Sequence, residues 1–224
     1  MKRLAVALVA VLFLSACAVT GQPARPGTAA TYNGATITTA EVAAWGAAQN
    51  ALGFTATSGD GVGYDPGAVL TLLMVQPALE AEATKEGIAF GDAQIEAEAQ
   101  SWMAANGADV SAPTQDMLDV VRLVRIVHAL LVTDEGNTAI RAAVESVEAH
   151  AVVNPLFGTF TLASFGASVN TLAEQQRTEG EMLGAVSYLV FRNLSGFDAS
   201  APRDWMVDEG ATRAVAIPSP SPAP

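Results

Sequence analysis

Few residues in this chain of 224 could carry out metal-ion or nucleophilic chemistry. It contains two histidines, His128 and His150, and one cysteine, Cys17. A metal site needs several such ligands, or acidic ones, close together. No Gly-x-Ser-x-Gly sequence is present, so the nucleophile turn of a serine hydrolase is not predicted. We therefore predict no catalytic residue, no cofactor and no metal ion.

The remaining polar candidates favour structural roles. His128 lies between apolar residues of a helical stretch, so we expect a satisfied, partly buried histidine. Charges on amphipathic helices usually face solvent, although five glutamates could pair as acid and base: Glu80, Glu82, Glu86, Glu96 and Glu98. The segment SGDGVGYDPG offers Asp60 and Asp65, but an EF-hand needs more acids and a final glutamate. We expect a solvated glycine-rich loop there.

The single cysteine lies where an apolar run ends. Lys2 and Arg3 give a positive start, residues 4–14 are apolar, and Ser15-Ala16 supplies the small residues that a signal peptidase requires. The run is shorter than the roughly 20 residues of a membrane-spanning helix. One interpretation of this segment is an ordinary secretory signal in which the cysteine is incidental.

Leu14-Ser15-Ala16-Cys17 resembles the lipobox of bacterial lipoproteins, whose cysteine is acylated and becomes the mature N-terminus. The resemblance implies lipidation of Cys17, with palmitate among the acyl chains, and a location on the outer face of the cell membrane. Each buried CH₂ of an acyl chain contributes about 0.8 kcal/mol to membrane binding. Only this lipid is expected to touch the membrane.

The charge of the chain excludes one class of partner. Loss of residues 1–16 removes Lys2 and Arg3, so the net charge of −12 becomes −14. Nucleic-acid binding needs a basic surface, and anionic headgroups would repel this domain. We therefore expect no nucleic acid as a partner.

Composition divides the chain into five parts. Residues 1–16 form the signal peptide and 17–30 a lipidated flexible linker, because "AVTGQPARPGTAA" is small, polar and proline-bearing. Residues 31–165 form one helical domain, and 166–210 a last helix with an extension. Residues 211–224, which end in "IPSPSPAP", form a disordered tail.

Helical signals dominate the domain. A strand-like piece turns at Asn33-Gly34. Helices are expected to start at the capping box Thr38-x-x-Glu41, at Asp65-Pro66, at Asp92, at Thr114 and at about Glu135. Pro77 is expected to kink the second helix. Apolar residues of the second and fourth helices should lie mainly in the core: Leu72, Leu73, Val75, Val124 and Ile126.

The pattern changes after His150. "AHAVVNPLFGTFTL" has β-branched and aromatic residues, an Asn-Pro break and no helical period, so an extended segment is predicted. A last helix is expected over residues 171–196. Because an isolated edge strand leaves backbone groups unpaired, the strand Tyr32–Ile37 should pair with one within Ala151–Phe160. The expected fold is mainly α, with a small antiparallel strand pair joining its two ends.

Three segments carry a family resemblance. Residues 30–42 (ATYNGATITTAEV) look like the opening of SurA-type chaperones and related foldases. Residues 72–100, with Ala83, Gly87, Ile88 and Asp92, resemble the next part of that N-terminal domain. Residues 152–160 (VVNPLFGTF) are similar to its closing strand in lipoproteins of high-GC Gram-positive bacteria. Together these motifs cover residues 30–160.

The resemblance implies a helical domain, closed by its first and last strands, that offers an apolar cleft to unfolded or extended secreted polypeptides. Larger relatives insert a parvulin prolyl-isomerase domain of roughly ninety residues, comparable to a small domain. That domain carries a His-Ile-Leu strand and a "GGxLG" segment. This chain has only "AHAVV" and nothing matching "GGxLG".

The leading interpretation is an anchored chaperone-like module, a holdase or foldase accessory. A degenerate prolyl isomerase, with His150 the first candidate residue, is an enzymatic alternative. An envelope assembly lipoprotein with one fixed partner is a structural alternative, which the sequence does not separate from the first.

Lipidation makes a direct prediction. Cys17→Ser removes the acylated sulfur, so the protein should leave the membrane fraction or remain unprocessed. Fractionation of cells followed by mass spectrometry of the mature N-terminus measures both. Thr20→Ser, in the same linker, serves as the control and should fractionate like the wild type. A membrane-bound, normally processed Cys17→Ser protein would contradict lipid anchoring.

Overall fold

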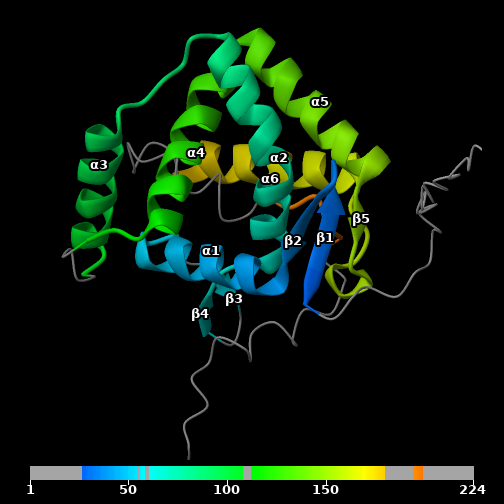
Figure 1. Ribbon diagram of the computed structural model, residues 1–224, viewed down its shortest axis with the longest axis horizontal. Helices are drawn as coiled ribbons and strands as arrows, with labels where there is room; N and C mark the ends of the chain where they lie inside the picture. Colours follow the sequence, from blue (N-terminus) through cyan, green and yellow to red (C-terminus); the bar gives the residue numbers. More distant parts are fainter. Residues whose placement is uncertain (1–26, 55, 59–60, 108–111, 180–193, 199–224) are drawn as a thin grey trace, which may run out of the picture.

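A computed structural model describes residues 27–54, 56–58, 61–107, 112–179 and 194–198. This part of the chain is mainly helical and carries a small three-stranded antiparallel sheet at one side of the helices (Figure 1). The mainly α fold predicted from the sequence is therefore confirmed.

The helices have these bounds: α1 Thr39–Ala51, α2 Pro66–Lys85, α3 Asp92–Ala105, α4 Gln115–Leu131, α5 Asp134–His150 and α6 Leu162–Glu179. The sheet has the order β2-β1-β5, formed by β1 Thr28–Tyr32, β2 Ala35–Thr38 and β5 Val152–Val153. A separate hairpin contains β3 Ala56–Ser58 and β4 Gly61–Gly63, and a 3₁₀ turn, η1, spans Pro155–Phe157.

Helix α2 lies at the centre of the fold. Its start is fixed by Asp65, whose carboxylate accepts hydrogen bonds from the N–H groups of Gly67 (2.8 Å) and Ala68 (3.3 Å). Every residue from Pro66 to Val75 is buried. A helix that is buried on all sides must be surrounded, and α1, α4, α5 and β1 all contact α2.

The sheet joins the two ends of the helical body. Asn33 and Gly34 both have positive φ (50° and 79°), as a two-residue Asn-Gly hairpin turn requires, and they connect β1 to β2. On its other side β1 pairs with β5, Ala30 opposite Val153 and Thr31 opposite Val152. The prediction is confirmed for the closing strand, because β5 lies within residues 151–160. It was wrong for the first strand, because residues 32–37 contain the turn and most of β2 and none of them pairs with β5.

Most predicted helix starts are confirmed. Thr38 and Glu41 form a complete capping box, and the hydroxyl of Thr114 accepts the Met117 N–H. At α3 the cap is Gly91, and Asp92 is the first helical residue, where its charge still suits the helix dipole. Helix α2 continues through Pro77 to Lys85.

Three local expectations were wrong. The predicted loop over residues 58–67 contains part of the β3–β4 hairpin, and β1 begins at Thr28, inside the expected linker. The last helix begins at Leu162, not Thr171, and Leu194–Gly196, expected to end it, are not helical. Ser and Gly favour helices weakly, and a Cβ at Gly196 would collide with the ring of Phe160. Residues 180–193 of that expected helix lie outside the described residues.

Asn154 makes the closure of the sheet testable. Its side-chain amide donates to Thr28 O (2.9 Å), and its side-chain oxygen accepts the Leu156 N–H (3.1 Å). Asn154→Ala removes both bonds, so the free energy of unfolding should fall by about 2 kcal/mol, at roughly 1 kcal/mol per bond. Urea denaturation measures this change.

The control is Asn170→Ala, which replaces an exposed asparagine of α6 and should leave the unfolding midpoint nearly unchanged. Equal midpoints for Asn154→Ala and Asn170→Ala would show that β5 contributes little to the cooperative fold.

Candidate functional site

The one predicted site residue, Cys17, lies outside the described residues, as does Asp60. Lipidation of Cys17 therefore stays a prediction. Within the described part of the chain, no helix is both long enough and apolar enough to cross a bilayer.

The two histidines are separate and exposed. His128 lies on the surface of α4, so the expectation of a partly buried histidine was wrong. Successive helical side chains point about 100° apart, and the apolar neighbours of His128 in sequence therefore face other directions. His150 ends α5 with its Nδ1 3.0 Å from Ser146 O. Among the described residues, no group of three or more His, Cys, Asp or Glu could hold a metal ion.

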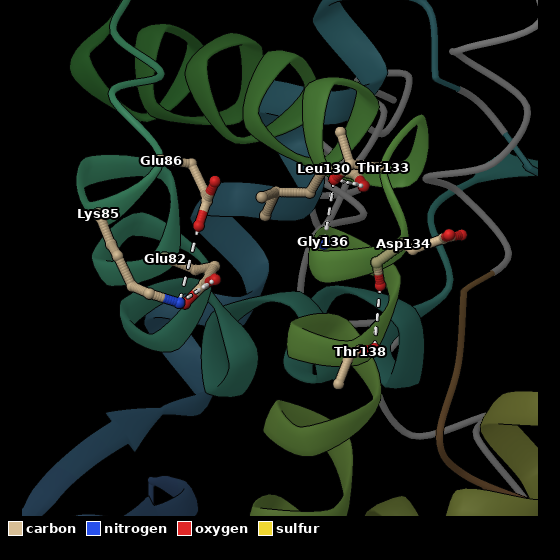
Figure 2. A network of polar contacts seen from close by, with 8 residues as sticks. All are labelled: Glu82, Lys85, Glu86, Leu130, Thr133, Asp134, Gly136 and Thr138. Atoms are coloured by element: carbon tan, nitrogen blue, oxygen red, sulfur yellow. Dashed lines mark hydrogen bonds and ion pairs between the residues drawn. The ribbon is translucent and has the colours of Figure 1, made fainter.

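The five glutamates do not converge on one site. Glu98 binds Arg125 of α4 (2.6 Å), and Glu80 accepts a hydrogen bond from Gln76 (2.7 Å). Glu82 and Glu86 flank Lys85, with N–O distances of 2.8 and 3.7 Å (Figure 2). Glu96 is exposed on α3. Glu82, Glu86 and Glu98 thus form ion pairs, Glu80 accepts from a neutral amide, and no two of the five are paired with each other as acid and base.

The most distinctive surface feature is apolar. Val152 in β5 is 55% exposed and Leu156 in η1 is 51% exposed. We call these two side chains the apolar edge, because β5 is the last strand of the sheet order β2-β1-β5. Transfer of large apolar side chains out of water lowers the free energy, so this edge favours contact with another apolar surface.

Local structure fixes the apolar edge in place. The backbone N–H of Asn154 donates to Ala29 O (2.8 Å), which ties the end of β5 to β1. Asn154 and Pro155 then start η1, and the third residue of that turn, Phe157, is 2% exposed and anchored in the core. In sequence, Val152 and Leu156 thus flank Asn154, which is hydrogen-bonded to β1.

A second pair of exposed apolar residues, Leu131 (39%) and Val132 (73%), lies in the turn between α4 and α5. Thr133 caps α5 there, and its N–H and hydroxyl also bond to Leu130 O (Figure 2). Gly136 passes so close to the Leu130 backbone that a Cβ would collide with it. This turn is a tight helix junction.

The five apolar residues expected in the core are all buried: Leu72, Leu73, Val75, Val124 and Ile126. They therefore do not line an exposed surface, and an apolar contact surface must be sought elsewhere. The sequence analysis missed Val152 and Leu156, although their β-branched and apolar types in a segment without helical period were the available signal.

Comparison of the chain with known protein families, with curated proteins and with solved structures finds no match. The resemblance of residues 30–160 to SurA-type chaperones accordingly stays a prediction.

The Glu82–Lys85–Glu86 cluster makes a titration prediction. The hydrogen bond that Lys85 donates to the Glu82 carboxylate, and then the charge of that carboxylate, raise the pKa of Lys85 above 10.5. A raised pKa means that the interaction stabilises the fold below about pH 10 and is lost as pH rises through the folded-state pKa. Because Lys85 is exposed, the effect on stability should be small.

Glu82→Gln removes the negative charge and leaves only a neutral amide oxygen as the acceptor, so the pKa of Lys85 should move back toward 10.5. NMR titration of the Lys85 side chain measures it, with Glu96→Gln as the control, since Glu96 does not bind Lys85. An unchanged Lys85 titration in Glu82→Gln would contradict the assigned cause.

Proposed function

We propose that this protein is a lipid-anchored, extracytoplasmic chaperone-like binding module that holds unfolded or extended secreted polypeptides. The apolar edge is the observation that carries the proposal. An extended chain exposes apolar side chains and backbone groups together, and a sheet edge with apolar neighbours suits both.

The connectivity of the fold also supports the proposal. The resemblance implied first and closing strands paired across a mostly helical body, and β1 pairs with β5 in that arrangement. Helix α5 ends at His150 and β5 begins at Val152, so no domain is inserted at "AHAVV", the segment compared above with the His-Ile-Leu strand of a parvulin domain. The absence of an inserted domain at this position supports a holding activity without prolyl isomerisation.

The chemistry of the surface is compatible with promiscuous binding. Apolar contacts gain strength from buried area and not from a particular sequence, so many clients can use the same residues. A mature net charge of −14 keeps the protein soluble while Val152 and Leu156 are exposed. It also favours basic or neutral client segments over acidic ones.

The test uses the mature chain carrying Cys17→Ser, which is free of lipid. At several-fold molar excess it should suppress the aggregation of an unfolded model protein, followed by light scattering, and should not speed isomerisation of a proline peptide. The double variant Val152→Asp, Leu156→Asp should lose most of the suppression, because charged carboxylates replace both exposed apolar side chains.

The matched control is the pair Leu131→Asp, Val132→Asp, which makes the same changes in the α4–α5 turn. It should retain the activity of the parent chain. Absence of suppression by the parent would contradict the holding function and favour one fixed partner, which a pulldown would show as a single stoichiometric protein. Catalysed isomerisation would instead favour the enzymatic alternative.

A further inference from the structure

A short segment far along the chain is inserted into the core. Leu194, Ser195 and Phe197 are 6%, 7% and 3% exposed, and Gly196 is also buried. The segment Leu194–Asp198 is extended, and it appears in orange near α6 in Figure 1. We call it the plug segment.

The plug segment is bound as an added strand. Phe197 forms an antiparallel bridge with Phe160, the N–H of Thr161 donates to Gly196 O (2.8 Å), and the N–H of Asp198 donates to Thr159 O (3.4 Å). Such main-chain pairing holds a peptide by its backbone, and it is a recurring mode of peptide recognition.

Three further contacts define a slot around it. The ring of Phe197 lies 5.3 Å from that of Phe160, edge to face, and 6.0 Å from that of Phe157. The Gly196 N–H donates to the hydroxyl of Thr71 on α2 (3.0 Å). Because a Cβ at Gly196 would collide with Phe160, only glycine fits at this point.

Two hydroxyl groups of the slot keep a partner without the plug segment, whereas the Thr161 N–H would lose its acceptor, Gly196 O. The Thr71 hydroxyl donates to Gly67 O within α2 (2.7 Å), so departure of Gly196 leaves that donor satisfied. The Thr161 hydroxyl accepts the Ser164 N–H and so caps α6 whether or not Gly196 is present. Departure of the plug segment would expose the backbone edge of Thr159–Thr161 and the faces of the Phe157 and Phe160 rings that contact Phe197.

We propose that this slot, lined by Thr71, Phe157 and Thr159–Thr161, is a peptide-binding site and that the plug segment occupies it as an internal ligand. Its external occupant is an extended stretch of a client polypeptide with an apolar residue, a small residue, glycine and an aromatic residue in succession. The inference rests on the proposed holding function and specifies where an extended client would bind. The part of the slot formed by residues 157–161 follows directly after the apolar edge in sequence.

The test opens the slot in a chain that has already folded. A protease site is inserted between residues 186 and 187 of the mature Cys17→Ser protein, and the purified protein is cut. Binding of a fluorescent peptide with the sequence of residues 192–200 is then followed by anisotropy. The intact protein should bind it at least about tenfold more weakly than the cut protein, because only molecules with an open slot bind.

Two peptide variants report on the geometry. Peptides with Gly196→Ala or Phe197→Ala should fail to bind the cut protein, because the first collides with Phe160 and the second loses the aromatic anchor. Thr71→Val in the cut protein should weaken binding, since the Gly196 N–H loses its acceptor. Thr71→Ser, which keeps the hydroxyl, should weaken it less.

A cut protein that stays folded and does not take up the wild-type peptide overturns the proposal. So does a cut protein that loses its cooperative melting transition without recovery on peptide addition, since the segment is then an inseparable part of the core. Aggregation assays of the intact and cut proteins test the holding function separately. Suppression by both without peptide uptake refutes the slot alone, whereas peptide uptake without suppression refutes the holding function alone.

Discussion

Complete burial of the first half of α2 is the constraint on which the rest of the fold depends. Leu70 and Met74 lie on one face of the helix, Leu72 and Leu73 point to other sides, and each of these four side chains is at most 8% exposed. Burial of each contributes about 1.5–3 kcal/mol. Because one flat layer covers only one face of a helix, these residues require neighbours on every side.

The neighbours come from distant parts of the sequence, and single polar contacts set where they lie. The Tyr32 hydroxyl donates to the Ser146 hydroxyl oxygen (2.8 Å) and links β1 to α5, two of the elements that contact α2. Thr71 is buried within α2 and presents its hydroxyl to Gly196. An apolar core tolerates many arrangements, whereas a buried N–H needs one particular acceptor. These contacts therefore fix how the elements are aligned with one another, which hydrophobic burial alone would specify only loosely.

Local signals in the sequence were sufficient for the helices α1 to α5 and for the closing strand, but not for the bounds of α6. The Thr38 capping box and the Asp65-Pro66 pair act within a few residues, so their meaning does not depend on the fold. The exposure of His128 and the binding of Leu194–Asp198 were not predictable in this way. Both depend on which surface faces which partner, and the spacing of Gly196 and Phe197 gives no sign that Phe160 lies beside them.

Chain closure also has a consequence for the order of folding. Asn154 and Thr28 are bonded across 126 residues, and Thr71 and Gly196 across 125. During synthesis at roughly 5–20 residues per second, β1 waits on the order of 6–25 s for β5 to appear. The apolar residues Leu70 to Met74 of the central helix are synthesised about a third of the way into this interval, and they lack part of their cover for the rest of it. The protein thus passes through a state with exposed apolar surface of the kind that chaperones bind.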